Sequence, residues 1–135
     1  MPIRIVRLGS PRQKNEGPRL GTVRRPPRGV PKREFATQNW YDVWLPDLAP
    51  SAALLKAAPG LVAEAAGWKR FATRYRAEMN QPAARRLLDL LAALSHSADF
   101  AVGCYCADES RCHRSILRQL LQERDAKVIA PQRRE

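Results

Sequence analysis

The sequence predicts an α/β fold, a small layered sheet that is partly parallel and flanked by helices. Apolar residues recur at helical spacing over residues 61–95 and again over 112–123. Between these two segments, residues 98–105 form a short apolar run that is typical of a buried strand. Helices that lead into and out of a buried strand are the arrangement of layered α/β folds. The length of 135 residues suits a single domain with one hydrophobic core.

The N-terminal third predicts two short strands joined to a long basic loop. Apolar and basic residues alternate over 3–8, which indicates a strand that ends at Gly9, and 20–23 could form a second one. Residues 10–34 are rich in Pro, Gly and Arg. Three prolines within 26–31 remove backbone donors and fix φ, so we expect a loop there.

The next segment, 35–48, is rich in aromatic residues. Trp40, Trp44 and Leu48 lie four residues apart, which predicts a short helix that breaks near Pro46. Such aromatic clusters are more often part of a core than a surface on which bases stack, and both interpretations stay open.

Three helices follow in the sequence. Ser51 is expected to cap a short helix that stops before Pro59. A longer helix is expected over 61–80, with an interruption near Gly67. A third begins at Pro82, with Asn80 as its cap, and runs to residue 95.

The C-terminal third predicts a strand, a polar loop and a helix, at 99–105, 107–111 and 112–123. Residues 127–129 could form a last strand. We expect this strand to pair in parallel with 99–105, with the helix as the right-handed crossover between them. Residues 131–135 form a charged tail of the same domain, which we take to span 1–135.

The charge of the chain favours anionic partners. The formal net charge is +11, and residues 1–35 hold ten Lys and Arg against two acids. This excess points to a phosphate-containing ligand or nucleic acid, although a basic arm that only improves solubility has the same composition. No apolar run approaches the roughly 18 residues of a membrane helix, and the N-terminal residues lack a signal-peptide pattern. We therefore expect a cytoplasmic protein that is not in a membrane, of unknown oligomeric state and unknown cofactor.

All three cysteines lie within nine residues, at Cys104, Cys106 and Cys112. An odd, clustered set excludes the disulfide framework of a small secreted domain. In a reducing compartment such thiols indicate a metal site, a reactive thiol or simple packing.

The leading hypothesis is an anion site at the start of the helix 112–123. A helix N-terminus offers free N–H donors and the positive end of the helix dipole, and it follows the carboxyl end of a strand, where α/β sheets bind ligands. Arg111, His113 and Arg114 add cationic groups beside Cys112 and Ser115. The combination suits a phosphate or carboxylate, such as that of a nucleotide or nucleic acid.

Two alternatives use the thiols directly. Cys106 or Cys112 could be a nucleophile activated by the same positive groups, with His113 or Asp42 as acid or base. The loop acids Asp108 and Glu109 speak against a bound phosphate dianion, and the Arg spacing differs from that of a phosphatase loop.

The second alternative is a structural zinc site. Cys104, Cys106, Cys112 and His113 have the ligand types that zinc prefers, in the pattern C-x-C-x5-C-H. The C-x-C spacing is tighter than the usual C-x2-C grip.

The third reading is that Cys104 is a small core residue and that the arginines pair with the loop acids.

Several separated motifs resemble one family. Residues 42–51 resemble its D-x-W-x-x-x-L-A-P-S segment, and 68–78 resemble its W-x-x-F-x-x-x-Y-x-x-E helix. Residues 27–29 match the end of its R-x-W-P-R-G loop, and 104–117 are similar to a Cys-x-Cys…Cys-His-Arg variant. The chain is thus identified as similar to the YeaO-like family, domain of unknown function 488.

The resemblance implies a compact α/β domain and no particular reaction. It nominates a set of site residues: Arg25, Arg28, Asp42, Trp44, Ser51, Tyr75, Cys106, Cys112, His113 and Arg114. We expect the loop that carries Arg25 and Arg28 to converge on the helix start at Cys112.

The site hypotheses divide these residues by role. The residues considered catalytic are Cys106, Cys112 and His113. The residues considered ligand-binding are Arg25, Arg28, Asp42, Trp44, Tyr75, Arg111, Arg114 and Ser115.

Overall fold

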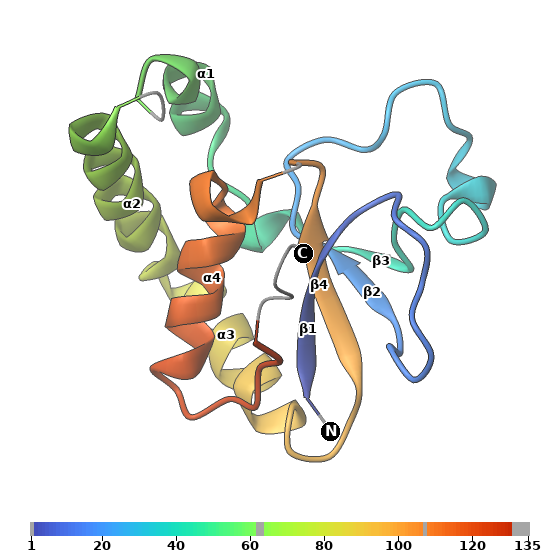
Figure 1. Cartoon of the computed structure of the whole chain (residues 1–135). Coiled ribbons are helices and arrows are strands. Elements are labelled where there is room, and N and C mark those ends of the chain that lie inside the picture. Colours follow the sequence, from blue (N-terminus) through green and yellow to red (C-terminus); the bar gives the residue numbers. More distant parts are fainter. Residues whose placement is uncertain (1, 62–63, 107, 131–135) are drawn as a thin grey trace.

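The computed structural model describes residues 2–61, 64–106 and 108–130 of the chain. Its centre is a four-stranded sheet in the order β1 (Ile3–Arg7), β4 (Phe100–Cys104), β2 (Arg19–Gly21) and β3 (Val43–Trp44) (Figure 1). Every pairing between these strands is parallel. The α/β class and the layered sheet predicted from the sequence are confirmed.

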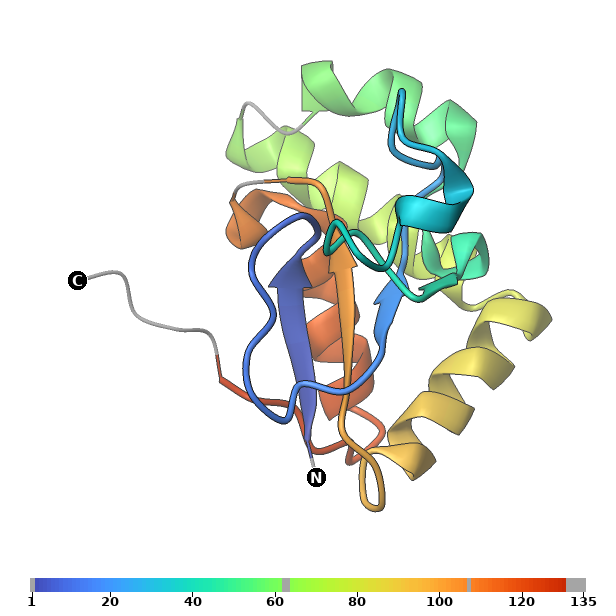
Figure 2. The ribbon, with the colours of Figure 1, turned by 90° about the vertical axis from the view of Figure 1, so that its right-hand side faces the viewer.

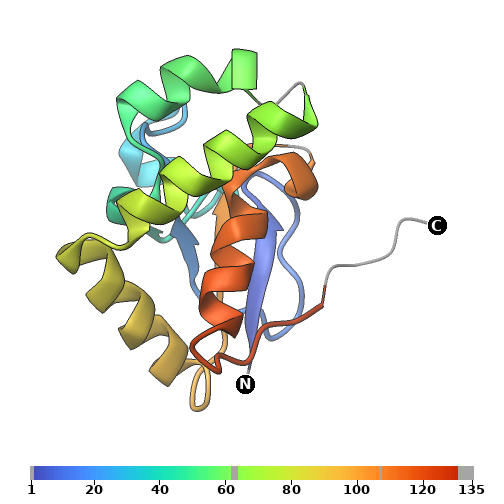
Figure 3. The ribbon, with the colours of Figure 1, turned by 90° about the vertical axis from the view of Figure 1, so that its left-hand side faces the viewer.

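Helices cover one face of the sheet. They are α1 (Ala52–Leu61), α2 (Ala65–Met79), α3 (Pro82–Leu94) and α4 (His113–Gln122). Figure 3 shows α2, α3 and α4 in front of the strands, whereas the segments that join β1 to β2 and β2 to β3 lie on the other side (Figure 2). No helix among the described residues has the length and apolar character needed to cross a bilayer.

The strand β4 lies between β1 and β2, and all five of its residues are buried. This explains the continuous apolar run in the sequence, because a strand covered on both faces has no polar side. The helix α4 follows it and packs against β4, α2 and α3, burying Ile116, Leu117, Leu120 and Leu121. The end of β4 and the start of α4 are therefore fixed relative to each other by the core.

The aromatic segment is not the short helix that the spacing of Trp40, Trp44 and Leu48 predicts. It contains β3 and a 3-10 turn at Pro46–Leu48. The Asp42 N–H donates to the Arg19 carbonyl, and the Leu45 N–H donates to the Gly21 carbonyl. These bonds hold the segment extended at the edge of the sheet, so tertiary pairing overrides the helical spacing.

Three helix boundaries also differ from the sequence predictions. The backbone of α1 continues through Pro59 to Leu61, although a proline inside a helix removes one hydrogen bond and crowds the preceding turn. Gly67 does not interrupt α2, because one glycine costs only about 1 kcal/mol in a packed helix. The cap of α3 is Gln81 and not Asn80, which ends α2. Ser51 does cap α1, accepting from the Leu54 N–H at 3.1 Å.

The predicted pairing of 99–105 with 127–129 is wrong. Val128 forms a single parallel bridge to Ile3 of β1. Since β1 and β2 already occupy both edges of β4, the chain that leaves α4 pairs instead with the outer edge of β1. The charged tail 131–135 lies outside the described residues.

Candidate active site

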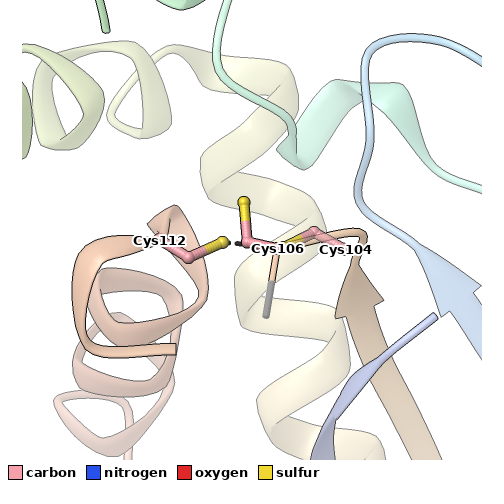
Figure 4. Close-up of side chains that lie close together, drawn as sticks. All are labelled: Cys104, Cys106 and Cys112. Atoms are coloured by element: carbon pink, nitrogen blue, oxygen red, sulfur yellow. Dashed lines mark hydrogen bonds between the residues drawn. The ribbon is translucent and has the colours of Figure 1, made fainter. Parts of the chain in front are cut away.

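The three thiols gather where β4 ends and α4 begins. Cys104 is the last residue of β4, Cys112 is the N-cap of α4, and Cys106 lies in the segment between them. Their sulfur atoms all lie within 4.8 Å of one another, and those of Cys104 and Cys112 are 2.7 Å apart. Cys104 and Cys112 are buried, whereas Cys106 is exposed. Figure 4 shows the Cys106 sulfur pointing away from the line that joins the other two.

The polar loop returns the chain to α4 through a short 3-10 turn at Glu109–Arg111. Arg118 of α4 binds both carboxylate oxygens of Glu109, at 2.9 and 3.0 Å. The Ser110 N–H and hydroxyl both donate to Asp108. In the sequence, the negative charge of Glu109 is an argument against a bound anion. In the structure this charge is paired with the guanidinium of Arg118.

Arg114 is buried beside the thiols. Its residue is only 3% exposed, and its Nη2 donates to the backbone carbonyl of Cys106. Its Nε has no hydrogen-bond partner within the described part of the chain. A buried guanidinium with a free donor stabilises a neighbouring negative charge.

The cluster favours one ionised sulfur. Hydrogen bonds from the thiols of Cys104 and Cys112 lower the pKa of Cys106 to about 2, and the charge of Arg114 acts in the same direction. Hydrogen bonding to Cys106 raises the pKa of Cys104 far above its ordinary value, with further contributions from Cys112 and burial. A hydrogen bond from Cys104 lowers the pKa of Cys112, but its bond to Cys106 and burial outweigh this and raise it to about 11. Ionisation is thus favoured at the exposed thiol, whereas the two buried thiols keep their protons.

His113 is a neutral residue behind the cluster. Its Nε2 lies 2.8 Å from the Thr22 carbonyl oxygen, which can only accept, so Nε2 carries the ring proton. Nδ1 is then unprotonated and lies 3.6 Å from the Cys112 sulfur. Burial lowers the pKa of His113 to about 4. At neutral pH the imidazole is uncharged, and its Nδ1 faces the sulfur of Cys112.

A pocket of about 710 Å³ opens above the cluster. Cys104, Cys106 and His113 contribute to one side of it, at the carboxyl ends of the parallel strands. Arg24, Arg25 and Arg28 from the basic loop line it too. Its walls are otherwise largely apolar, from Val23, Pro26, Pro27, Trp40, Pro50, Leu55 and Tyr105.

The arginines of this loop differ in their bonding. Arg24 donates to the carbonyls of Pro46, Ala49 and Pro50, which ties the loop to the start of α1. Arg25 and Arg28 are exposed, and their side chains have no bonding partner among residues 2–61, 64–106 and 108–130. Their charges are therefore available to a ligand in the pocket.

The structure brings part of the expected site together. Arg25, Arg28, Cys106 and His113 line one pocket, and Cys112 and Arg114 lie directly behind it. Ser115 hydrogen-bonds the Cys112 carbonyl at 3.0 Å.

Other expected site residues are engaged elsewhere. Asp42 forms an ion pair with Arg12 at 2.8 Å and accepts from the Arg19 N–H. Trp44 donates from Nε1 to the Val23 carbonyl, outside the cysteine pocket. Tyr75 is fully buried, donates to the Leu48 carbonyl and packs edge-on against His113.

Two further expected residues point away from the thiols. The Arg111 guanidinium lies over the Trp68 ring, with its carbon 5.9 Å from the ring centre. Ser51 donates to Glu78 at 2.5 Å and caps α1.

Sequence reasoning missed Thr22, Tyr105 and Arg24, and it left Trp40 open between a core residue and a stacking surface. Trp40 and Tyr105 are half-buried, pack edge-to-face at 5.8 Å and form a wall of the pocket. The one available signal was the position of Tyr105 between two cysteines at the end of a strand. Nothing in the local sequence links Thr22 to His113, which is 91 residues away.

The same thiols have the composition of a metal site. Three sulfurs within 4.8 Å of one another match the ligand type of zinc, and His113 Nδ1 faces the sulfur of Cys112. The bond from His113 Nε2 to the Thr22 carbonyl is also the kind of second contact that metal-binding histidines make.

Comparison with known proteins identifies a family and no individual relative. A family model described as the active DUF488-N3 subclade matches residues 3–125. No curated protein and no solved structure matches the chain.

Proposed function

We propose, on the premise that this chain belongs to the active DUF488-N3 subclade, that it is a cysteine-dependent enzyme acting on a phosphate-bearing substrate. Cys106 is the nucleophile, and Arg25 and Arg28 bind the phosphate. One observation carries the proposal: the exposed Cys106 of the thiol cluster lines the same pocket as two guanidiniums that have no partner among the described residues.

The surroundings of Cys106 support a thiolate nucleophile. A thiolate attacks electrophiles, and it forms readily near a helix N-terminus and a cationic side chain. Here Arg114 supplies the charge, α4 supplies the helix end, and the buried thiols supply donors. A negative sulfur also provides a counter-charge for Arg114, which forms no ion pair with a carboxylate in the described ranges.

The sequence hypothesis of an anion at the Cys112-His113-Arg114 helix start takes a more definite form in this proposal. The thiol cluster lies at that helix end, so the anion it stabilises is the Cys106 sulfur. The phosphate of the substrate then lies farther out, at Arg25 and Arg28, whose planar groups suit phosphate oxygens. The apolar walls with Trp40 and Tyr105 suit a substrate with a flat ring, such as a nucleotide.

Competition between alkylation and phosphate binding tests this function. Iodoacetamide should label Cys106 before the two buried cysteines, and a nucleoside monophosphate should slow that labelling. The double substitution Arg25→Ala with Arg28→Ala should weaken protection by roughly tenfold or more, because it removes both charged phosphate contacts. The control, Lys69→Ala with Arg70→Ala on α2, removes the same charge from exposed positions outside this pocket and should protect like the unmodified protein. Equal labelling of all three cysteines, or the same protection in the Arg25 and Arg28 variant, would contradict the proposal.

A zinc-stabilised module is the second candidate, favoured by the spacing of the three sulfurs. Zinc would be held by Cys104, Cys106 and Cys112, with His113 beside them. Elemental analysis separates the two functions. One equivalent of zinc whose removal unfolds the protein would support the module, and a folded protein without stoichiometric zinc would remove this candidate.

A further inference from the structure

A second pocket lies next to the first one. Its volume is about 540 Å³, and its lining includes Pro26, Lys32, Arg33, Tyr41 and Trp44. Pro26 lines both pockets, so the two share a wall at the middle of the basic loop. A ligand longer than one nucleotide could pass from the first pocket over Pro26 into the second.

Trp44 gives this second pocket an aromatic surface. It lies in the edge strand β3, and 44% of its surface is exposed, which is unusual for so large an apolar residue. The bond from its Nε1 to the Val23 carbonyl, at 2.8 Å, fixes the indole. A fixed and exposed ring is suited to stack a flat group, at little cost in side-chain entropy.

The charges around Trp44 are positive. Lys32 and Arg33 are exposed on the 3-10 turn Lys32–Glu34, and neither side chain has a bonding partner in the described part of the protein. The acid in the pocket, Asp42, is paired with Arg12. An aromatic platform with unpaired cations is the arrangement that binds a base together with its phosphate.

The pocket also has a buried polar group to satisfy. Tyr41 is 3% exposed, and its hydroxyl has no hydrogen-bond partner among the residues described. Buried hydroxyls in folded proteins are nearly always hydrogen-bonded. The hydroxyl is closed to solvent, so a base or sugar in this pocket could bond it only after the atoms that cover it move.

We propose that the substrate is single-stranded nucleic acid, with one nucleotide in the pocket of Cys106 and its neighbour stacked on Trp44 between Lys32 and Arg33. The inference rests on the proposed function for the first pocket and adds the polymer as substrate class. Single strands fit better than duplexes because their bases are free to stack on a side chain.

Binding of a fluorescent hexanucleotide to the full chain, measured by anisotropy, tests the second pocket. The parent protein and all variants in this experiment carry Cys106→Ser, so no thiol at this position can react with the oligonucleotide. Trp44→Ala should weaken binding roughly tenfold by removing one stacked base, whereas Trp44→Phe should restore most of the affinity. The phenylalanine keeps a ring but lacks the bond to Val23, so this pair separates stacking from a structural effect.

Matched controls separate stacking from general attraction to charge. An abasic oligomer of the same length has the phosphates without the bases, and it should bind more weakly and show no dependence on Trp44. Lys32→Ala with Arg33→Ala should flatten the dependence of log affinity on log salt by about 1.4, since single strands contribute about 0.7 per phosphate contact. Lys69→Ala with Arg70→Ala has the same change in charge and should leave the slope unchanged.

The outcomes distinguish this inference from the proposed function. Two results would overturn the inference. One is that the protein binds the hexanucleotide and the abasic oligomer with equal affinity, and the other is that Trp44→Ala binds the hexanucleotide as tightly as its parent does. In that case protection of Cys106 by a mononucleotide would still support the enzyme. Conversely, an unreactive Cys106 with Trp44-dependent binding would leave a nucleic-acid site without the chemistry.

Discussion

Two buried arginines show how differently this fold uses the same side chain. Arg19 is fully buried, and all three guanidinium nitrogens have partners: Nε and Nη2 bind Glu16, and Nη1 binds the carbonyls of Ser10 and Asn39. Arg114 is almost as buried and donates to the Cys106 carbonyl, but its Nε has no hydrogen-bond partner within the described ranges. The first ties the loop between β1 and β2 to the sheet. The guanidinium of Arg114 keeps an N–H donor available beside the three thiols.

The bonding of a buried guanidinium separates a structural role from a chemical one. A guanidinium with a carboxylate and carbonyls around it has its charge and donors satisfied, so it contributes to structure. A buried guanidinium that has no carboxylate partner and lies next to an ionisable group changes the pKa of that group. The variants below break each arginine in turn and ask whether stability or thiol chemistry responds.

Arg19→Met should have the largest effect on stability. It leaves the Glu16 carboxylate, 2% exposed, without its partner, and breaking a buried ion pair in this way costs about 3–5 kcal/mol. Urea denaturation at pH 7 measures the loss. Adding Glu16→Gln should recover part of it, since a neutral side chain costs less to bury. A loss below about 1 kcal/mol would show that this ion pair is not structural.

His113 should make stability depend on pH between its two pKa values. Burial holds the folded pKa at about 4, below the ordinary 6.5, so the unfolded chain binds the proton more tightly. The contribution of the neutral His113 to the free energy of unfolding is fully present above pH 6.5. It falls by about 3 kcal/mol as the pH drops towards 4, since each unit of difference between the two pKa values corresponds to about 1.4 kcal/mol. Urea denaturation across this range should show a shallower fall for His113→Gln, whose amide can still donate to Thr22. Parallel curves for the two proteins would contradict the buried neutral histidine.

The sequence predicted the elements whose signal is local. The apolar run of β4, the amphipathic pattern of α4 and the cap at Ser51 each lie within a few residues, and all three are in the structure. The incorrect predictions concern segments whose structure is set by contacts with distant parts of the chain. Hydrogen bonds to β2 hold residues 43–44 as a strand despite helical spacing, and β1 takes the bridge that was expected for β4.

The candidate site was predictable in part for the same reason. Cysteine spacing and the residues at the start of α4 are visible in the sequence, as is the basic loop. The contact of Thr22 with His113 and the wall formed by Trp40 and Tyr105 depend on chain segments that meet only in the fold. The exposure of Cys106, against the burial of Cys104 two residues earlier, has no sequence signal because C-x-C places both in similar surroundings.

The pH dependence of Cys106 alkylation, with each cysteine followed by mass spectrometry, measures whether this sulfur is ionised at neutral pH. If the thiol cluster and Arg114 hold this sulfur as an anion, the rate should be flat from about pH 5 to 8, while an ordinary thiol rises towards its pKa of about 8.5. Arg114→Met should move the midpoint upward, because it removes a positive charge beside the sulfur, and Arg19→Met should not move it. A Cys106 midpoint near 8.5 that is the same in all three proteins would contradict the activated thiol.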